Sequence, residues 1–138
     1  MVQVNVAAMR RLFQFVLRRM QAQGGGTILN VASSAGLLPG GPYMAGYYAS
    51  KAYVVSMTRG VAEELREMHS PVYVCASCPG RWTPSSTTTR VVFALRGITP
   101  ELCVEEALLG MMHRKTIIVP LPLCGCAPAP SALYPSPC

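Results

Sequence analysis

Two kinds of hydrophobic spacing alternate along this chain. Between residues 4 and 23, apolar side chains recur every three or four positions opposite a face rich in arginine, which predicts an amphipathic helix. A short apolar run at 27–32 predicts a strand, the helical spacing returns at 47–67, and 72–77 is rich in β-branched and small apolar residues. The order helix, strand, helix, strand favours right-handed crossovers and a parallel sheet, so we expect an α/β fold.

Residues that end or begin helices add boundaries to this pattern. The cluster Gly24-Gly25-Gly26 follows the first helix and predicts its C-terminal break. Residues 69–71, which read His-Ser-Pro, end the second helix. Thr99 before Pro100 predicts the cap and first turn of a further helix that runs to about Arg114.

The composition is typical of a globular protein. At 138 residues one domain is expected, and 51% hydrophobic against 13% charged residues is richer in apolar side chains than usual. Such a chain needs a core, and the excess suggests apolar faces that further strands would cover.

The net charge of +6 and the pI near 9.2 raise the question of a nucleic-acid or membrane partner. The basic residues are scattered singly or in pairs, without interleaved aromatic residues, so we expect no nucleic-acid binding. Four arginines of the first helix are predicted to form a solvated face instead: Arg10, Arg11, Arg18 and Arg19. No apolar run approaches the roughly 20 residues of a membrane span, and the N-terminus lacks a signal-peptide layout, so we expect a cytoplasmic location.

Two pairs of closely spaced cysteines suggest a metal site, because Cys75 with Cys78 and Cys124 with Cys126 would supply four thiolates. Cys75 and Cys78 fall on the predicted buried strand, however, where successive positions face opposite ways and free cysteine is ordinary. We therefore expect no metal. A Ser-His-Asp triad is excluded because the chain has no aspartate.

Candidate acid–base chemistry comes from Tyr47 and Lys51, which stand four residues apart at the start of the second helix and so share one face. An unperturbed tyrosine has a pKa of about 10. A positive charge about 4 Å away favours phenolate by roughly 4 kcal/mol, or about three pH units, which would bring Tyr47 close to neutrality. Ser33 follows the first predicted strand, so its hydroxyl is placed to hydrogen-bond a substrate oxygen beside the phenol.

Four segments, in order along the chain, resemble the short-chain dehydrogenase/reductase family. They are residues 4–8 with Asn5, the serine strand and turn 28–36, the helix start 47–52, and the strand 72–80 that ends in Pro79-Gly80. Ser33 matches the family's catalytic serine better than its neighbour Ser34, because Gly36 follows it by three positions. The match covers about residues 2–80 and implies a partial doubly wound, Rossmann-like parallel sheet of three strands with flanking helices, the last strand lying within 115–120.

The resemblance also implies roles for the polar residues. Tyr47 would protonate the alkoxide as hydride reaches a ketone, or take the proton in the reverse direction. Lys51 would lower the pKa of Tyr47 and hydrogen-bond the nicotinamide ribose, and Ser33 would hold the carbonyl oxygen. Asn5 would anchor a proton path to Lys51, although asparagine before an apolar run is also favoured as a helix N-terminal cap. Pro79 and Gly80 would lie beside the nicotinamide of NAD or NADP.

The family's glycine-rich phosphate loop, which lies between a first strand and a first helix, has no counterpart in this sequence. The glycines at 24–26 follow a helix instead of a strand. We therefore expect the chain to begin midway through a doubly wound domain, without the N-terminal nucleotide-binding half whose residues distinguish NAD from NADP.

The chain departs from the family in two places. After Gly80 the family has an apolar pair and then a threonine that contacts the cofactor amide, whereas Thr83 comes one position too early here. The Pro/Cys-rich tail 121–138 has no periodic pattern and is predicted to be disordered. The domain prediction is accordingly a partial family domain at 1–120 followed by this tail.

Two functions remain open. The first is an NAD(P)-dependent oxidoreductase that transfers hydride between nicotinamide and a carbonyl or alcohol substrate. The alternative is a catalytically inactive remnant or an oligomerisation module of the same family. The resemblance also implies a homodimer or homotetramer that pairs the helix at 4–23 and the helix beginning at Tyr47 with their counterparts.

Overall fold

A computed structural model of the chain describes residues 1–80 and 99–120. Thr83 and the tail 121–138 lie outside the described residues, so the predictions made for them, and the domain boundary at 120, stay predictions.

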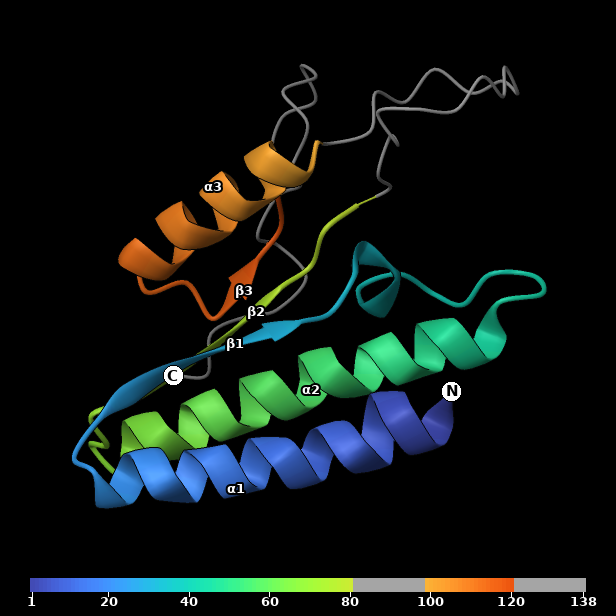
Figure 1. Cartoon of the computed structure of the whole chain (residues 1–138). Helices are drawn as coiled ribbons and strands as arrows, with labels where there is room; N and C mark the ends of the chain where they lie inside the picture. The colour runs from blue at the N-terminus through green and yellow to red at the C-terminus, as the bar shows by residue number, and fades with distance from the viewer. Residues whose placement is uncertain (81–98, 121–138) are drawn as a thin grey trace, which may run out of the picture.

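The described residues form helices and strands in the expected order (Figure 1). In chain order the elements are the π-helical turn η1 (Gln3–Ala8), α1 (Met9–Ala22), β1 (Gly26–Val31), the 3₁₀ turn η2 (Ser34–Gly36), α2 (Ala45–Glu67), β2 (Val72–Ser77), α3 (Pro100–Met112) and β3 (Ile117–Ile118). The helix predicted at 4–23 is thus divided into a π-helical turn and an α-helix. The last strand is shorter than the predicted segment 115–120 and comprises two residues.

The three strands form one parallel sheet in the order β1-β2-β3, which confirms the predicted α/β class. In the register, Gly26 pairs with Val72 and Val31 with Ser77. The backbone pairing continues beyond the strands, since the Ser34 amide donates to the Pro79 carbonyl at 2.9 Å. The segments that follow β1 and β2 therefore stay side by side at the carboxyl edge of the sheet.

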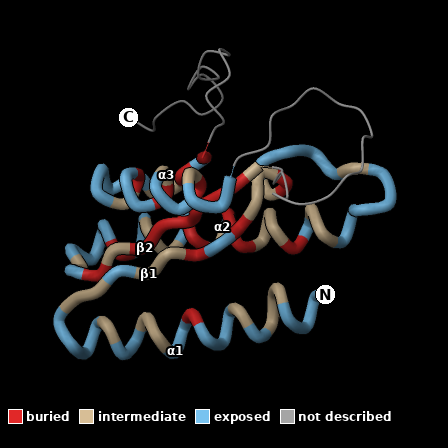
Figure 2. The backbone as a smooth tube through the Cα atoms, turned by 45° about the horizontal axis from the view of Figure 1, so that its top comes forward, coloured by how far each residue is buried: buried red, intermediate tan, exposed pale blue. Residues whose placement is uncertain are grey.

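Helices cover both faces of the sheet. Figure 1 shows α1 and α2 side by side on one face, while α3 lies on the other face next to β3. Buried positions are concentrated along β2 and the strand-facing side of α2, whereas α1 buries only Phe13 (Figure 2). The core consists of two groups of buried apolar side chains: Ala32, Val54, Val55, Ala76 and Cys78 in one, and Phe13, Leu65, Val72 and Val74 in the other.

A buried polar pair joins the sheet to α2. The Asn30 side-chain amide on β1 donates to the Thr58 hydroxyl at 2.9 Å, and that hydroxyl donates to the Val54 carbonyl at 2.8 Å. Because an unpaired buried amide is costly, this arrangement favours one register of β1 against α2.

The three α-helices end in the same way, with a residue in the left-handed region. These residues are Gly24 (φ 83°), His69 (φ 50°) and Arg114 (φ 55°). The next amide in each case returns to a carbonyl five residues back, as Gly25 does to Met20 at 3.0 Å. The predicted glycine break after the first helix is therefore confirmed.

Two further expectations concern the arginines of α1 and the possibility of a membrane span. The four arginines of α1 that were predicted to be solvated are all exposed: Arg10, Arg11, Arg18 and Arg19. Within residues 1–80 and 99–120, none of the helices combines the length and the apolar character that crossing a bilayer requires.

Candidate active site

An open cleft of about 460 Å³ lies at the carboxyl edge of the sheet, where the segments after β1 and β2 meet the start of α2. Eleven described residues line it: Val31, Ala32, Ser33, Ser34, Ala35, Leu38, Met44, Tyr47, Tyr48, Pro79 and Gly80. The structure thus brings together four of the residues predicted from the sequence, namely Ser33, Tyr47, Pro79 and Gly80. Ser34, the alternative to Ser33, lines the same cleft.

Ser33 occupies the turn between β1 and η2. Its backbone is extended, and its Oγ accepts a hydrogen bond from the Ala35 amide at 3.2 Å, which caps the 3₁₀ turn. A hydroxyl has one hydrogen to donate and two lone pairs to accept with. This contact uses a lone pair and leaves the hydroxyl hydrogen of Ser33 available to a ligand.

Tyr47 and Lys51 lie on one face of the first turns of α2, as the four-residue spacing predicted. The Lys51 ammonium lies 5.9 Å from the centroid of the Tyr47 ring. Nζ also donates a hydrogen bond to the Val31 carbonyl at 3.3 Å. Lys51 therefore ties α2 to the end of β1 and holds its charge beside the tyrosine.

Asn5 lies inside the π-helical turn η1, so its interpretation as an N-terminal helix cap is wrong. The residue before the turn is Val2, and no side chain caps that end. The Asn5 side-chain amide instead donates to Ser50 Oγ at 3.3 Å. Asn5 is not among the cleft-lining residues. The π-helical turn that carries it is of a kind that is frequent at functional sites.

Ser50 is a residue that the sequence reasoning missed. It is 3% exposed, and its hydroxyl donates to the Tyr47 carbonyl at 2.8 Å while accepting from Asn5. A serine inside a helix that bonds back to its own turn is a weak signal, because that pattern is common where no site is present. The role of Ser50 is visible only through its hydrogen bond with Asn5, which is 45 positions away in the sequence.

Gly36 sets the distance between the serine turn and α2. A Cβ at this position would lie 2.6 Å from the Lys51 carbonyl oxygen and 2.7 Å from its carbonyl carbon. Only glycine allows η2 to pack this closely on the helix backbone. The same turn carries Ser33, so this contact positions the serine relative to Tyr47.

Cys78 lies directly before Pro79. The side chains of Cys75 and Cys78 are fully buried, and that of Cys103 is 7% exposed. Burial raises the pKa of the Cys78 thiol, and the Ser33 amide with the charges of Arg59 and Lys51 opposes that shift only in part. The predicted buried free thiols at Cys75 and Cys78 are confirmed. In the part of the chain that the structure describes, histidine, cysteine and glutamate do not gather in groups of three or more that would hold a metal ion.

Comparison with known families shows to which family the chain belongs. The family model of the short chain dehydrogenases matches residues 1–92, which include all of the site residues described above. The chain belongs to the short-chain dehydrogenase family. This family comprises oxidoreductases, and the parallel sheet with flanking helices described here matches solved structures of the family.

Individual relatives of the short-chain dehydrogenase family align over most of the chain. D-beta-hydroxybutyrate dehydrogenase of Rhizobium meliloti is 31% identical over 127 residues, covering 86% of this chain and 46% of that protein. The solved structure of a 7beta-hydroxysteroid dehydrogenase has a TM-score of 0.73 at 28% identity and covers 87% of this chain and 46% of its own. A short-chain dehydrogenase from Sphingobium yanoikuyae, solved with NADPH, has a TM-score of 0.71 at 27% identity, with 88% and 47% covered. The chain thus spans about half the length of the relatives it matches.

Proposed function

We propose that the protein acts as an NAD(P)-dependent oxidoreductase that interconverts a carbonyl compound and an alcohol. The observation that carries this proposal is the pair of hydroxyls, Ser33 and Tyr47, lining one cleft with the Lys51 ammonium beside the tyrosine ring. Two hydroxyl donors in one cleft can both reach a single carbonyl oxygen, and the chain's membership of an oxidoreductase family supports the reaction class.

The roles of the residues follow from their chemistry. Tyr47 gives its proton to the oxygen of the substrate during reduction and takes it back during oxidation. Lys51 places its positive charge beside the Tyr47 ring, 5.9 Å from the ring centroid. Ser33 donates its hydroxyl hydrogen to the same oxygen and holds the carbonyl in place. Asn5 acts further from the cleft, through its hydrogen bond to Ser50.

NAD or NADP is the cofactor that we propose. The residues that would hold its nicotinamide end are Tyr47, Lys51, Pro79 and Gly80. They fit the group, because none of the residues that the structure describes lies within 4 Å of where a Cβ on Gly80 would be, and a planar ring can approach the described backbone there. When bound, nicotinamide supplies or accepts the hydride. A structural neighbour solved with NADPH supports this assignment.

The test is turnover by the full chain with NADH or NADPH and a panel of ketones, followed through nicotinamide absorbance. Tyr47→Phe should lower the rate by about 10² or more, because a positioned proton donor contributes that much. Tyr43→Phe is the matched control, since Tyr43 is fully exposed outside the cleft lining. Equal rates for the two variants would contradict the proton-transfer role of Tyr47.

A second candidate is a non-catalytic member of the family that serves as an oligomerisation module. It is favoured by the exposed apolar side chains of α1, since Leu12 and Phe15 are 65% and 63% exposed and could be covered by a second copy. Among the described glycines, Gly36, Gly40 and Gly41 lie between a strand and the following helix, but Gly36 packs on the Lys51 backbone and Gly41 against the Tyr48 ring, so neither of these two offers open backbone to a pyrophosphate. Nicotinamide turnover by the full chain would eliminate this candidate, and failure to bind NADH or NADPH in calorimetry would favour it.

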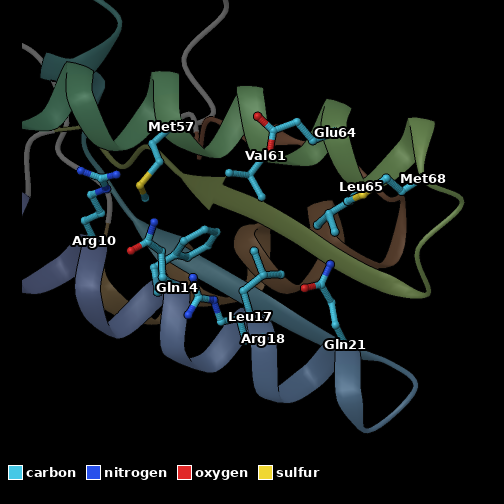
Figure 3. Close-up of a pocket in the computed structure, with 11 residues that line it drawn as sticks. Arg10, Gln14, Leu17, Arg18, Gln21, Met57, Val61, Glu64, Leu65 and Met68 are labelled. Atoms are coloured by element: carbon cyan, nitrogen blue, oxygen red, sulfur yellow. The ribbon is translucent and has the colours of Figure 1, made fainter.

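For either function we propose a homodimer or homotetramer that pairs α1 and α2 with a second copy. Leu12 and Phe15 on α1 are 65% and 63% exposed, although Leu12 belongs to the apolar face that was predicted for the helix at 4–23. Between the two helices runs a groove of about 420 Å³ into which Leu17 and Met57 project (Figure 3). Leu12→Glu should shift the mass measured by light scattering toward the monomer. Val104→Glu, at an exposed position of α3, should leave that mass unchanged.

A further inference from the structure

The cleft around Ser33 and Tyr47 is lined by a few hydroxyl groups and otherwise by apolar groups. Its described lining has hydroxyls on Ser33, Ser34, Tyr47 and Tyr48, and the rest of it is apolar: the two tyrosine rings, aliphatic side chains, the Met44 thioether and Pro79. Among these described lining residues none carries a charge, and the Lys51 ammonium beside the Tyr47 ring, which is not one of them, donates to the Val31 carbonyl at 3.3 Å. The reacting oxygen of a ligand therefore meets hydrogen-bond donors, while the rest of the ligand meets apolar surface.

Two apolar side chains stand at the rim of this cleft. Leu38, after η2, is 57% exposed, and Met44, directly before α2, is 50% exposed. Side chains of this kind gain free energy when a ligand removes them from water. They belong to the same cleft as the two hydroxyls, so one ligand can cover the rim and reach Ser33 and Tyr47 together.

An aromatic wall adds shape to the cleft. The Tyr48 ring lies edge-on to the Tyr47 ring, with centroids 6.3 Å apart and planes at 82°. Gly41 packs against the Tyr48 ring, since a Cβ there would come within 3.2 Å of its atoms. Tyr48 is thereby held as a fixed surface against which a flat or alicyclic group can pack.

We propose that the substrate is an uncharged ketone, or the matching secondary alcohol, that carries a bulky aromatic or alicyclic group next to the reacting carbon. This inference rests on the proposed function, because Ser33 and Tyr47 are assigned the carbonyl oxygen. In reduction, the carbonyl carbon gains the hydride of the reduced nicotinamide and its oxygen gains the proton of Tyr47. The products are the alcohol and the oxidised nicotinamide. The cleft volume of about 460 Å³ is the space that the substrate and the nicotinamide end of the cofactor would share.

The experiment compares two probes that differ only in charge, methyl 4-acetylbenzoate and 4-acetylbenzoate, on the full chain. Binding is measured by NMR of protein labelled at the methionine methyl groups, with the Met44 signal assigned from Met44→Leu. The neutral ester should shift the Met44 signal and bind about tenfold or more tightly than the carboxylate, because an unpaired charge is costly against apolar walls. Met44→Glu should weaken ester binding about tenfold by placing a charge at the rim. Met112→Glu, at an exposed position at the end of α3, should not.

Two results would overturn the proposal: tighter or equal binding of the carboxylate, or no binding of either probe. The measurement does not require turnover, so it separates this inference from the proposed function. Ester binding at Met44 that persists in Tyr47→Phe supports the ligand class even if no NADPH-dependent reduction occurs. In that case the proposed reaction fails and the binding site stands.

Discussion

Asn5 and Ser50 are joined by a hydrogen bond of 3.3 Å between segments 45 positions apart in the sequence. Ser50 in turn donates to the Tyr47 carbonyl, so the π-helical turn is connected to the turn of α2 that carries the candidate acid–base residue. Ser50 is buried, which means that water cannot readily replace either partner. The pair is therefore expected to contribute to stability as well as to the position of Tyr47.

Removing either partner should cost about 1 kcal/mol of the free energy of unfolding, the usual net value of such a bond. In a double-mutant cycle of Asn5→Ala and Ser50→Ala, measured by urea denaturation, we expect a coupling of about 0.5–1.5 kcal/mol. Ser56→Ala, at an exposed position of the same helix, is the control and should change stability by less than about 0.5 kcal/mol. Purely additive effects of the two substitutions would show that the hydrogen bond does not form in solution.

Gly36→Ala should destabilise the fold by roughly 1–3 kcal/mol, because the new methyl group would overlap the Lys51 backbone and force η2 away from α2. The same displacement should lower turnover, since η2 begins directly after Ser33. Gly60→Ala is the matched control. Gly60 lies inside α2 with nothing within 4 Å of the added carbon, so alanine there should stabilise the helix by about 0.5–1 kcal/mol. Thermal denaturation should move the two variants in opposite directions, and equal shifts would contradict the steric argument.

His69→Gly should raise the free energy of unfolding, by about 1 kcal/mol, because His69 follows α2 with φ 50°, where a side chain is strained and glycine is not. Gly24→Ala, which places a methyl group at φ 83° after α1, should lower stability by a similar amount. Chemical denaturation of both variants checks the sign. Arg114→Gly is a less clean test, because the Arg114 guanidinium also lies 5.0 Å from the centre of the Tyr73 ring.

Stability should fall as the pH rises above the ordinary thiol range. Burial raises the pKa of Cys75, Cys78 and Cys103 in the folded protein, so these thiols keep their protons while unfolded chains lose theirs above about pH 8.5. Their contribution is fully present below that pH and is lost as the pH rises toward the folded values, at no more than about 1.4 kcal/mol per pH unit for each thiol. Urea midpoints at about pH 7.5 and 9.5 under reducing conditions measure the change. Cys78→Ala should make the dependence shallower, and a midpoint that rises with pH would refute this account.

Sequence periodicity identified the elements that depend on local pattern. The strand at Val72–Ser77 has the predicted bounds, and α2 begins two residues before the predicted Tyr47. The shared face of Tyr47 and Lys51 could also be predicted, because it follows from helical geometry alone.

The features that sequence reasoning missed depend on tertiary contacts or on small differences in backbone energy. A π-helical turn at Gln3–Ala8 differs from an α-helix only in which carbonyl each amide reaches, and its sequence has no distinctive signal. The N-terminal cap proposed for Asn5 failed because the helical backbone starts before it and its amide is bonded to Ser50. His69 and Arg114 adopt a conformation that usually belongs to glycine, so local chemistry could not predict it.

The contact at Gly36 also bears on how such a protein can acquire new chemistry. Because a peptide group, and not a side chain, sets the separation between the serine turn and the helix, gradual changes in core volume cannot adjust it. If the proposed reaction is retained, variation is expected at positions such as Leu38 and Met44, where exposed side chains can be exchanged without moving Ser33 or Tyr47. Substitutions that change ligand preference are accordingly expected first at these exposed cleft residues and only later at the residues between η2 and α2.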